Sequence, residues 1–346
     1  MRGSVVRWLW TTTGMASGGA RLSLLPIAIA YGWGMRARAV WGAHRAQRLP
    51  PLPIPTVAVG SLLVGGAGKT PVASWLAGAL RDRNLRPGIV LRPYGGDEAV
   101  VHRMLQPTVP VVEAKDRRRG VHELSRLGCR VAVLDDAYQR TDLTPDLTVA
   151  LVPADAQDLP RWVHPAGPWR EVRAGLRRAD LVIVTRKQAS GAVAARLAGD
   201  VRRRWPTKPV ARAHLSMGGL RRMTDGGVVP PGSLDGRSVL VCAGVADPRP
   251  LVADCQRLGA RTELLAWPDH HRYRAADLTR LLQIAARVDY VVVTEKDAVK
   301  LRGVWPDGRE SPLVAALEVE WEAGEALVSA LLQRLATGHQ RMRMSG

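Results

Sequence analysis

A glycine-rich segment that ends in a lysine and a threonine has residue types suited to binding phosphate. The chain runs from an apolar stretch at Val57–Val59 through Gly-Gly-Ala-Gly to Lys69 and Thr70. Glycines let backbone N–H groups close around phosphate oxygens, a lysine can reach the β- and γ-phosphates, and a threonine hydroxyl suits Mg²⁺. The usual pattern has a further glycine where this chain has Leu63. We assign the nucleotide site to Gly65, Gly66, Ala67, Gly68, Lys69 and Thr70.

Two carboxylates follow a second apolar stretch. Val131–Leu134 is apolar throughout and leads directly into Asp135 and Asp136. A strand that ends in this way typically places acid next to Mg²⁺ in nucleotide-hydrolysing and kinase folds. Paired aspartates can also form a turn or a helix cap, but next to a phosphate loop the metal interpretation is favoured. Together the two motifs predict a nucleoside triphosphate and Mg²⁺, and they leave the acceptor open.

A sheet must position these motifs, and the pattern of the chain predicts one. After the proline-rich linker 50–55, short β-branched runs alternate with helical stretches. The expected strands are 56–59, 88–91, 109–112, 131–134, 148–152 and 181–185, and the expected helices are 70–83, 117–127 and 188–205. Strands that are apolar throughout and separated by helices indicate a parallel sheet covered on both faces. The predicted fold class is therefore α/β, with a mostly parallel, P-loop NTPase-like sheet.

A second, smaller α/β domain is predicted after the Gly/Pro-rich stretch 226–232. Its expected strands are 238–242, 262–267 and 290–294, and its expected helices are 251–258 and 275–286. The predicted organisation is an N-terminal segment at 1–49, a P-loop core at 50–225, the second domain at 226–338 and a frayed tail at 339–346.

The charge of the chain favours an anionic partner. Fifty Lys and Arg residues against 31 Asp and Glu give a net charge of +19. An anionic partner and a genomic composition bias, consistent with the absence of Phe, both explain this excess. Three scattered cysteines form no disulfide framework, which favours a reducing compartment.

The N-terminal segment combines basic and apolar residues. Seven arginines and no acidic residue occur up to Arg48, and the uncharged run Leu22–Met35 has fourteen residues. That length is short of the roughly 20 residues that a membrane-spanning helix needs. Flanking arginines and tryptophans are typical of a segment that lies in an anionic membrane surface. A buried helix and a cleaved signal peptide are the alternatives.

Further segments, taken in order, resemble the tetraacyldisaccharide 4'-kinase family, the lipid A 4'-kinases of Gram-negative bacteria, over nearly the whole chain. The most specific are Asp-Asp-x-x-Gln, Pro-Ala-Gly-Pro-x-Arg-Glu and Thr-Glu-Lys-Asp. The matching segments are Leu25–Tyr31, Val64–Pro71, Arg92–Gly95, Gly96–Glu98, Ala114–Arg117, Leu134–Gln139, Pro165–Glu171, Pro268–His271 and Thr294–Leu301.

The resemblance implies an enzyme at the cytoplasmic face of the bacterial inner membrane. It would use ATP and Mg²⁺ to phosphorylate the 4'-hydroxyl of a tetraacylated glucosamine disaccharide 1-phosphate, giving lipid IVA. Its partners would be this acylated disaccharide and an anionic lipid surface, with no nucleic acid, and a monomer is the favoured state.

The resemblance also implies roles for individual residues. Asp97 would be the catalytic base, assisted by His270, and Lys69 would act on the transferred phosphate. The implied metal site is Thr70, Asp135, Asp136 and Glu171, and the implied substrate and phosphate contacts are Arg92, Tyr94, Arg117 and Arg170.

Two other classes of protein fit less well. A partitioning-type ATPase that acts as a switch at DNA or membrane would carry a signature lysine where this chain has Val64. A nucleic-acid-binding protein would explain the positive charge, but the sequence has no stacking platform of interleaved aromatic and basic residues.

Overall fold

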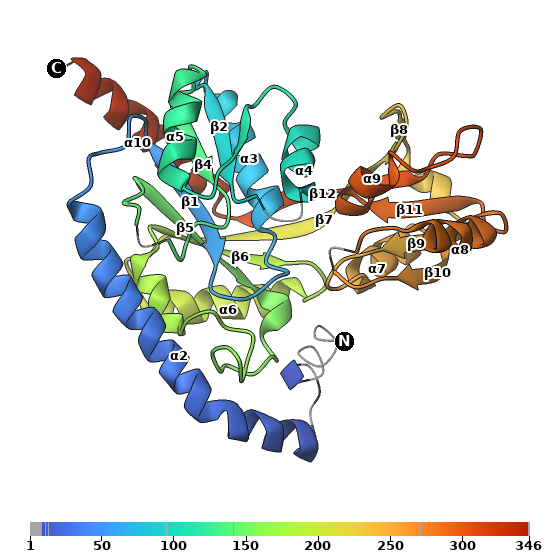
Figure 1. Cartoon of the computed structure of the whole chain (residues 1–346), viewed down its shortest axis with the longest axis horizontal. Coiled ribbons are helices and arrows are strands. Elements are labelled where there is room, and N and C mark those ends of the chain that lie inside the picture. The colour runs from blue at the N-terminus through green and yellow to red at the C-terminus, as the bar shows by residue number, and fades with distance from the viewer. Residues whose placement is uncertain are drawn as a thin grey trace. The chain divides into compact units, whose positions relative to one another are not determined.

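The computed structural model describes residues 9–10, 12, 14–93, 96–140, 142–269 and 271–344. The chain forms two compact units (Figure 1). Unit 1 comprises residues 1–93, 105–214 and 321–346, and unit 2 comprises residues 94–104 and 215–320. This division differs from the predicted single boundary at 225/226, because two long strands begin in one unit and end in the other. Residues 321–338, predicted in the second domain, belong to unit 1.

Unit 1 contains a parallel sheet with the strand order β7-β6-β5-β1-β4-β2-β3. Its strands are β1 (Thr56–Ser61), β2 (Pro87–Leu91), β3 (Val111–Glu113), β4 (Val131–Leu134), β5 (Leu147–Pro153), β6 (Leu181–Arg186) and β7 (Val210–Arg222). Most of these strands are buried on both faces, as their continuous apolar runs predicted. The predicted fold class is confirmed.

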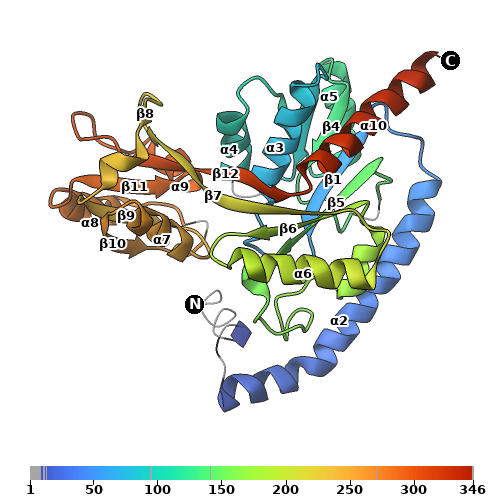
Figure 2. The same ribbon diagram turned by 180° about the vertical axis from the view of Figure 1, so that it is seen from behind.

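Helices cover both faces of the unit 1 sheet (Figures 1 and 2). These are α3 (Lys69–Arg81), α5 (Arg117–Arg126), α6 (Gly191–Arg204) and α10 (Glu325–Met344). Helix α5 packs on one face through Val121 and Leu124, which share a core with Ala58 and Leu134 of the strands. Because strand side chains alternate, the other face of the same strands is left for α3. Helix α10 continues through residues 339–344, where a frayed tail was predicted.

Unit 2 has its own parallel strands in the order β10-β9-β11-β12. They are β9 (Ser238–Ala243), β10 (Arg261–Ala266), β11 (Tyr290–Thr294) and β12 (Leu313–Ala323), and a short β8 (Val228–Val229) pairs antiparallel with β7. The helices are α4 (Asp97–Leu105), α7 (Arg249–Arg257), α8 (Ala275–Ala285) and α9 (Glu295–Leu301). Among the described residues of both units, short 3₁₀ helices cover Ala154–Ala156, Arg173–Arg178 and Pro231–Leu234.

In the N-terminal segment, residues 15–47 form helix α2 (Met15–Gln47), which is much longer than the predicted uncharged run. Pro26 lies inside α2, and the helix is bent (Figure 1), as expected where a proline removes a backbone hydrogen bond. One face of α2 packs on unit 1 through buried Ala28 and partly buried Leu24 and Tyr31. In the part of the chain that the structure describes, no helix is long and apolar enough to cross a membrane.

Candidate active site

The phosphate loop forms a backbone nest between β1 and α3. Gly65, Gly66 and Gly68 have φ angles of 73°, 68° and 76°, in the left-handed region that glycine adopts without strain. Gly68 is left-handed and is followed by the helical Lys69, and such an alternation of handedness turns successive N–H groups toward one concavity, which binds anions. Gly68 is also the N-cap of α3, so the positive end of the helix dipole adds to the site. A Cβ atom at Gly65 or Gly66 would meet open space, so backbone conformation is what requires glycine there.

Lys69 and Arg170 share one carboxylate. The Lys69 Nζ atom lies 2.8 Å from Oδ1 of Asp136, and an Arg170 guanidinium nitrogen lies 2.8 Å from the same oxygen. Burial alone would raise the pKa of Asp136, but the two cations outweigh burial and hold that pKa below its ordinary value. Asp136 also has a φ angle of +49°, which is uncommon for a residue other than glycine. Both cations predicted to act on phosphate therefore lie together beside the nest.

Thr70 and Asp135 form an all-oxygen pair suited to Mg²⁺. The Thr70 hydroxyl donates to Oδ2 of Asp135 over 3.3 Å, and the other oxygen of Asp135 accepts the N–H of Asp136 at 2.8 Å. Asp135 is 2% exposed. Among the described residues, no three His, Cys, Asp or Glu side chains are grouped so as to hold a metal. A hydroxyl with one carboxylate fits Mg²⁺, which usually keeps several waters and takes further oxygens from the substrate phosphates.

Glu171, predicted as a metal ligand, is held by other side chains. Arg178 donates to both of its carboxylate oxygens at 2.9 and 2.8 Å, and Gln139 donates to one of them at 3.1 Å. The same Gln139 amide donates to the backbone oxygen of Ser61 at the end of β1. The predicted metal residues thus form two groups. Thr70 and Asp135 form the candidate Mg²⁺ site, whereas Asp136 and Glu171 already pair with cations.

Arg117 lies under the acidic strand end. Its guanidinium donates to the backbone oxygen of Asp135 at 3.1 Å and to that of Ala114 at 2.7 Å, and the residue is 3% exposed. Burial lowers the pKa of Arg117, and the positive charge of Arg140 lowers it further. The exposed Arg92 also lowers this pKa, whereas the carboxylates of Asp135 and Asp136 raise it. The predicted substrate contact Tyr94 lies outside the described residues.

The predicted base Asp97 begins α4 in unit 2 and is 2% exposed. Its Oδ2 atom lies 3.3 Å from Nζ of Lys300, and the next residue, Glu98, pairs with Lys296 at 3.1 Å. The predicted partner His270 lies outside the described residues. Its neighbour His271 contacts Oδ2 of Asp277 at 2.9 Å and stacks on Trp267.

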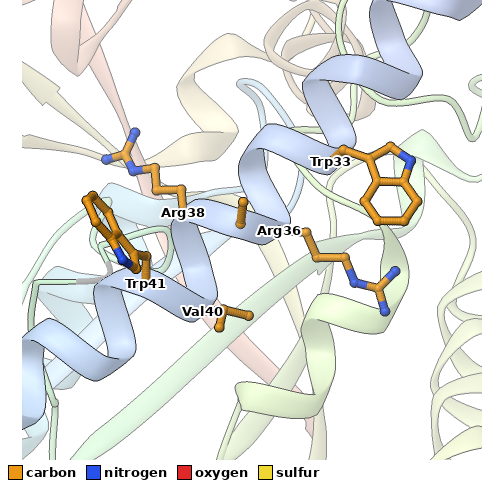
Figure 3. A pocket seen from close by; sticks show the side chains of 6 residues that line it. Trp33, Arg36, Arg38, Val40 and Trp41 are labelled. Atoms are coloured by element: carbon orange, nitrogen blue, oxygen red, sulfur yellow. The ribbon is translucent and has the colours of Figure 1, made fainter.

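The outer face of α2 carries large apolar side chains between arginines. Leu22, Ile29, Trp33, Val40 and Trp41 are between 56% and 82% exposed. Trp33, Arg36, Ala37, Arg38, Val40 and Trp41 line an open pocket on the helix (Figure 3). Figure 3 shows that the labelled side chains extend outward from the helix, the two tryptophans from different turns. We call these exposed residues of α2 the outer face.

Several residues of the site were not assigned from the sequence. Gln139, Lys296 and Lys300 belong to the specific segments Asp-Asp-x-x-Gln and Thr-Glu-Lys-Asp-Ala-Val-Lys. The segments were recognised in the sequence, but no role was assigned to these three residues. Arg178 follows Glu171 by seven residues in an arginine-rich stretch, and no pattern marks it out.

Comparison with known proteins gives one consistent result. A family model described as tetraacyldisaccharide-1-P 4'-kinase matches residues 20–336. The tetraacyldisaccharide 4'-kinase of Pelobacter propionicus is 34% identical over 324 residues, which cover 86% of this chain and 87% of the relative. That of Aromatoleum aromaticum is 36% identical over 280 residues, which cover 75% of this chain and 77% of the relative.

A solved structure is similar to this chain in fold. The crystal structure of the "apo" form of LpxK from Aquifex aeolicus in complex with ATP matches with a TM-score of 0.69 and 26% identity. The match covers 91% of this chain and 99% of that chain. The chain belongs to the tetraacyldisaccharide-1-P 4'-kinase family.

Proposed function

We propose that this lipid A pathway kinase transfers the γ-phosphate of ATP to the 4'-hydroxyl of a tetraacylated glucosamine disaccharide 1-phosphate, giving lipid IVA. The bond from the sugar oxygen to Pγ forms as the bond from Pγ to the bridging oxygen breaks, and ADP leaves. The proton of the hydroxyl goes to a carboxylate of the enzyme. The observation that carries the proposal is the glycine nest with Lys69 and Arg170 beside it, within a chain of this family.

Unit 1 supplies the nucleotide chemistry in this account. The N–H groups of the nest bind phosphate oxygens, and Lys69 leaves Asp136 to contact the γ-phosphate as charge develops there. Arg170, which shares the same carboxylate, neutralises the transferred group. Thr70 and Asp135 would hold Mg²⁺, which supplies charge neutralisation between the phosphates. Asp136 orients Lys69 and Arg170, Glu171 orients Gln139 and Arg178, and both carboxylates would contact Mg²⁺ through water.

The proposed base is a carboxylate at the start of α4. Asp97 accepts the proton of the 4'-hydroxyl, and His270 orients or tunes that carboxylate. Arg92, Tyr94 and Arg117 are proposed contacts for the phosphate of the disaccharide. Arg92 and Arg140, which lie close enough to Arg117 to lower its pKa, support an anionic ligand at that place, and the carboxylates of Asp135 and Asp136 balance part of their charge.

The outer face of α2 is proposed to lie on the anionic surface of the inner membrane, at its cytoplasmic side. Two exposed tryptophans with two arginines between them combine burial in the headgroup region with attraction to anionic lipids. The opposite face of α2 is part of the core of unit 1 through Ala28, so deleting the helix would disturb the fold as well as the membrane contact.

The proposed reaction is tested by incubating the full chain with ATP-Mg²⁺ and the acylated disaccharide 1-phosphate in detergent micelles, followed by mass spectrometry of the lipid. We expect a product with one added phosphoryl group. ATP hydrolysis at the same rate with and without the acceptor, and an unchanged lipid, would instead support a switch ATPase.

A further inference from the structure

Two consecutive carboxylates at the start of α4 are matched by two lysines of α9. Asp97 pairs with Lys300 at 3.3 Å, and Glu98 pairs with Lys296 at 3.1 Å. Residues four apart lie on the same face of a helix, so one face of α9 presents both ammonium groups to the first turn of α4. The two bridges fix both the position and the rotation of that turn.

Burial makes the bridge to Asp97 different from the bridge to Glu98. The side chains of Asp97 and Lys300 are 2% and 13% exposed, whereas those of Glu98 and Lys296 are 25% and 27% exposed. Water screens the outer pair well and the inner pair poorly. A buried carboxylate without a compensating charge takes up a proton instead of staying ionised. Lys300 supplies that compensation at 3.3 Å, and Lys296, which interacts more strongly with Glu98 than with Asp97, adds a second attraction.

Helix α9 is itself held in place. Thr294 caps its N-terminus, and Asp297 is fully buried. The Asp297 carboxylate accepts the N–H of Gly244 at 3.0 Å, the hydroxyl of Tyr273 at 3.0 Å and the hydroxyl of Thr294 at 2.6 Å. These partners tie α9 to the segments that follow β9 and β10. The next turns are anchored in the core by fully buried Ala298 and Leu301. The two lysines therefore extend from a rigid support.

We propose that Lys300 is a positioning residue for the phosphoryl transfer: its ammonium group keeps the Asp97 carboxylate ionised and aimed, while Lys296 fixes the turn through Glu98. This inference rests on the proposed role of Asp97 as the base. The proton of the sugar hydroxyl moves to Asp97, and Lys300 takes no part in the proton transfer. Both lysines of the segment Thr294–Leu301 thus position the first turn of α4, Lys300 through Asp97 and Lys296 through Glu98.

The test compares the pH profiles of kcat/KM for the wild-type chain and for Lys300→Met, Lys300→Arg and Lys296→Met. We expect Lys300→Met to lower kcat at least tenfold with little change in the KM for ATP. The acidic limb of the Lys300→Met profile, where kcat/KM falls as the pH is lowered, should move to higher pH by about one unit or more, because the nearby positive charge is gone. Lys300→Arg keeps the charge and should keep the limb in place. Lys296→Met removes a bridge between the same two helices and should move the limb less than Lys300→Met does.

Asp97→Asn, measured alongside, separates the two levels of the account. If Asp97→Asn keeps normal turnover, the proposed base is wrong. If Asp97→Asn is inactive while Lys300→Met keeps the wild-type kcat and acidic limb, the role of Lys300 is wrong and that of Asp97 stands. Melting curves and ATP binding show whether each variant folds. Should Lys300→Met fail to fold, Lys300→Arg decides: a limb displaced as far as one unit despite the retained charge contradicts the inference.

Discussion

Replacing Lys69 by Met removes one of the two cations that share Asp136, and it separates the catalytic and structural roles of the lysine. In the reaction, Lys69 is proposed to meet charge that develops on the transferred phosphoryl group. Loss of one such contact typically lowers turnover about 100-fold or more, which corresponds to ~2.7 kcal/mol of transition-state stabilisation. We expect a loss of that size in kcat/KM.

The same substitution should change folding stability little. Asp136 keeps its 2.8 Å contact with Arg170, and its side chain is 37% exposed, so solvent screens the lost pair. The expected loss is below ~1 kcal/mol near neutral pH. The lowered pKa of Asp136 stabilises the fold above the ordinary value of 3.8, and that contribution is lost as pH falls below it. Lys69→Met keeps only one of the two cations that lower this pKa. Protonation of Asp136 at low pH should therefore reduce the free energy of unfolding of Lys69→Met less than that of the wild-type chain.

The assay is steady-state transfer of phosphate to the lipid acceptor, with melting curves at neutral and acidic pH. Arg81→Met is the matched control, because it removes a cation from the opposite end of the same helix α3, where Arg81 pairs with Asp82. It should keep wild-type turnover. A Lys69→Met enzyme with turnover within threefold of the wild-type value, and folded as shown by melting, would refute the assignment of the nucleotide site.

Two further predictions concern the base and the membrane contact. Asp97→Ala should lower kcat by about 10²–10⁴-fold with little change in the KM for ATP, and His270→Ala should lower kcat less. The double variant should lose less kcat than the product of the two single losses. Strictly multiplicative losses in this kinetic cycle would contradict a joint role. The double variant Trp33→Glu/Trp41→Glu should bind phosphatidylglycerol vesicles at least about tenfold more weakly, because apolar burial of both tryptophans in the lipid is lost. The control is Leu127→Glu, which changes another exposed apolar residue. If both variants sediment equally with the vesicles, the membrane contact lies elsewhere.

The sheet and the phosphate loop were predictable because their signals are local. Each strand of unit 1 that is buried on both faces appears in the sequence as a continuous apolar run, such as Val131–Leu134. The glycines of the loop are required by its backbone conformation, so the loop too can be recognised from a short stretch of sequence. In unit 2, β11 (Tyr290–Thr294) is also a continuous apolar run and has the predicted bounds, whereas β9 and β10 each differ from the prediction by one residue, and β10 is mostly exposed.

The parts that were not predictable depend on contacts between distant segments. Whether Asp136 holds a metal or two cations depends on Arg170, which the fold brings to it from beyond the next strand. The return of residues 321–338 to unit 1 depends on the pairing of long strands, which no local pattern marks. The length of α2 was missed because apolar residues occur on both its packed and its outer face, so its sequence lacks a clear helical period.

The identity of the phosphorylated oxygen tests the central claim most directly. With ATP labelled at the γ-phosphate and the acylated disaccharide 1-phosphate as acceptor, the labelled lipid is isolated and the position of the new phosphate is determined by tandem mass spectrometry and phosphorus NMR. The account predicts one labelled phosphate at the 4' position for each ADP released. Label at another position, or ADP released without labelled lipid, would contradict it.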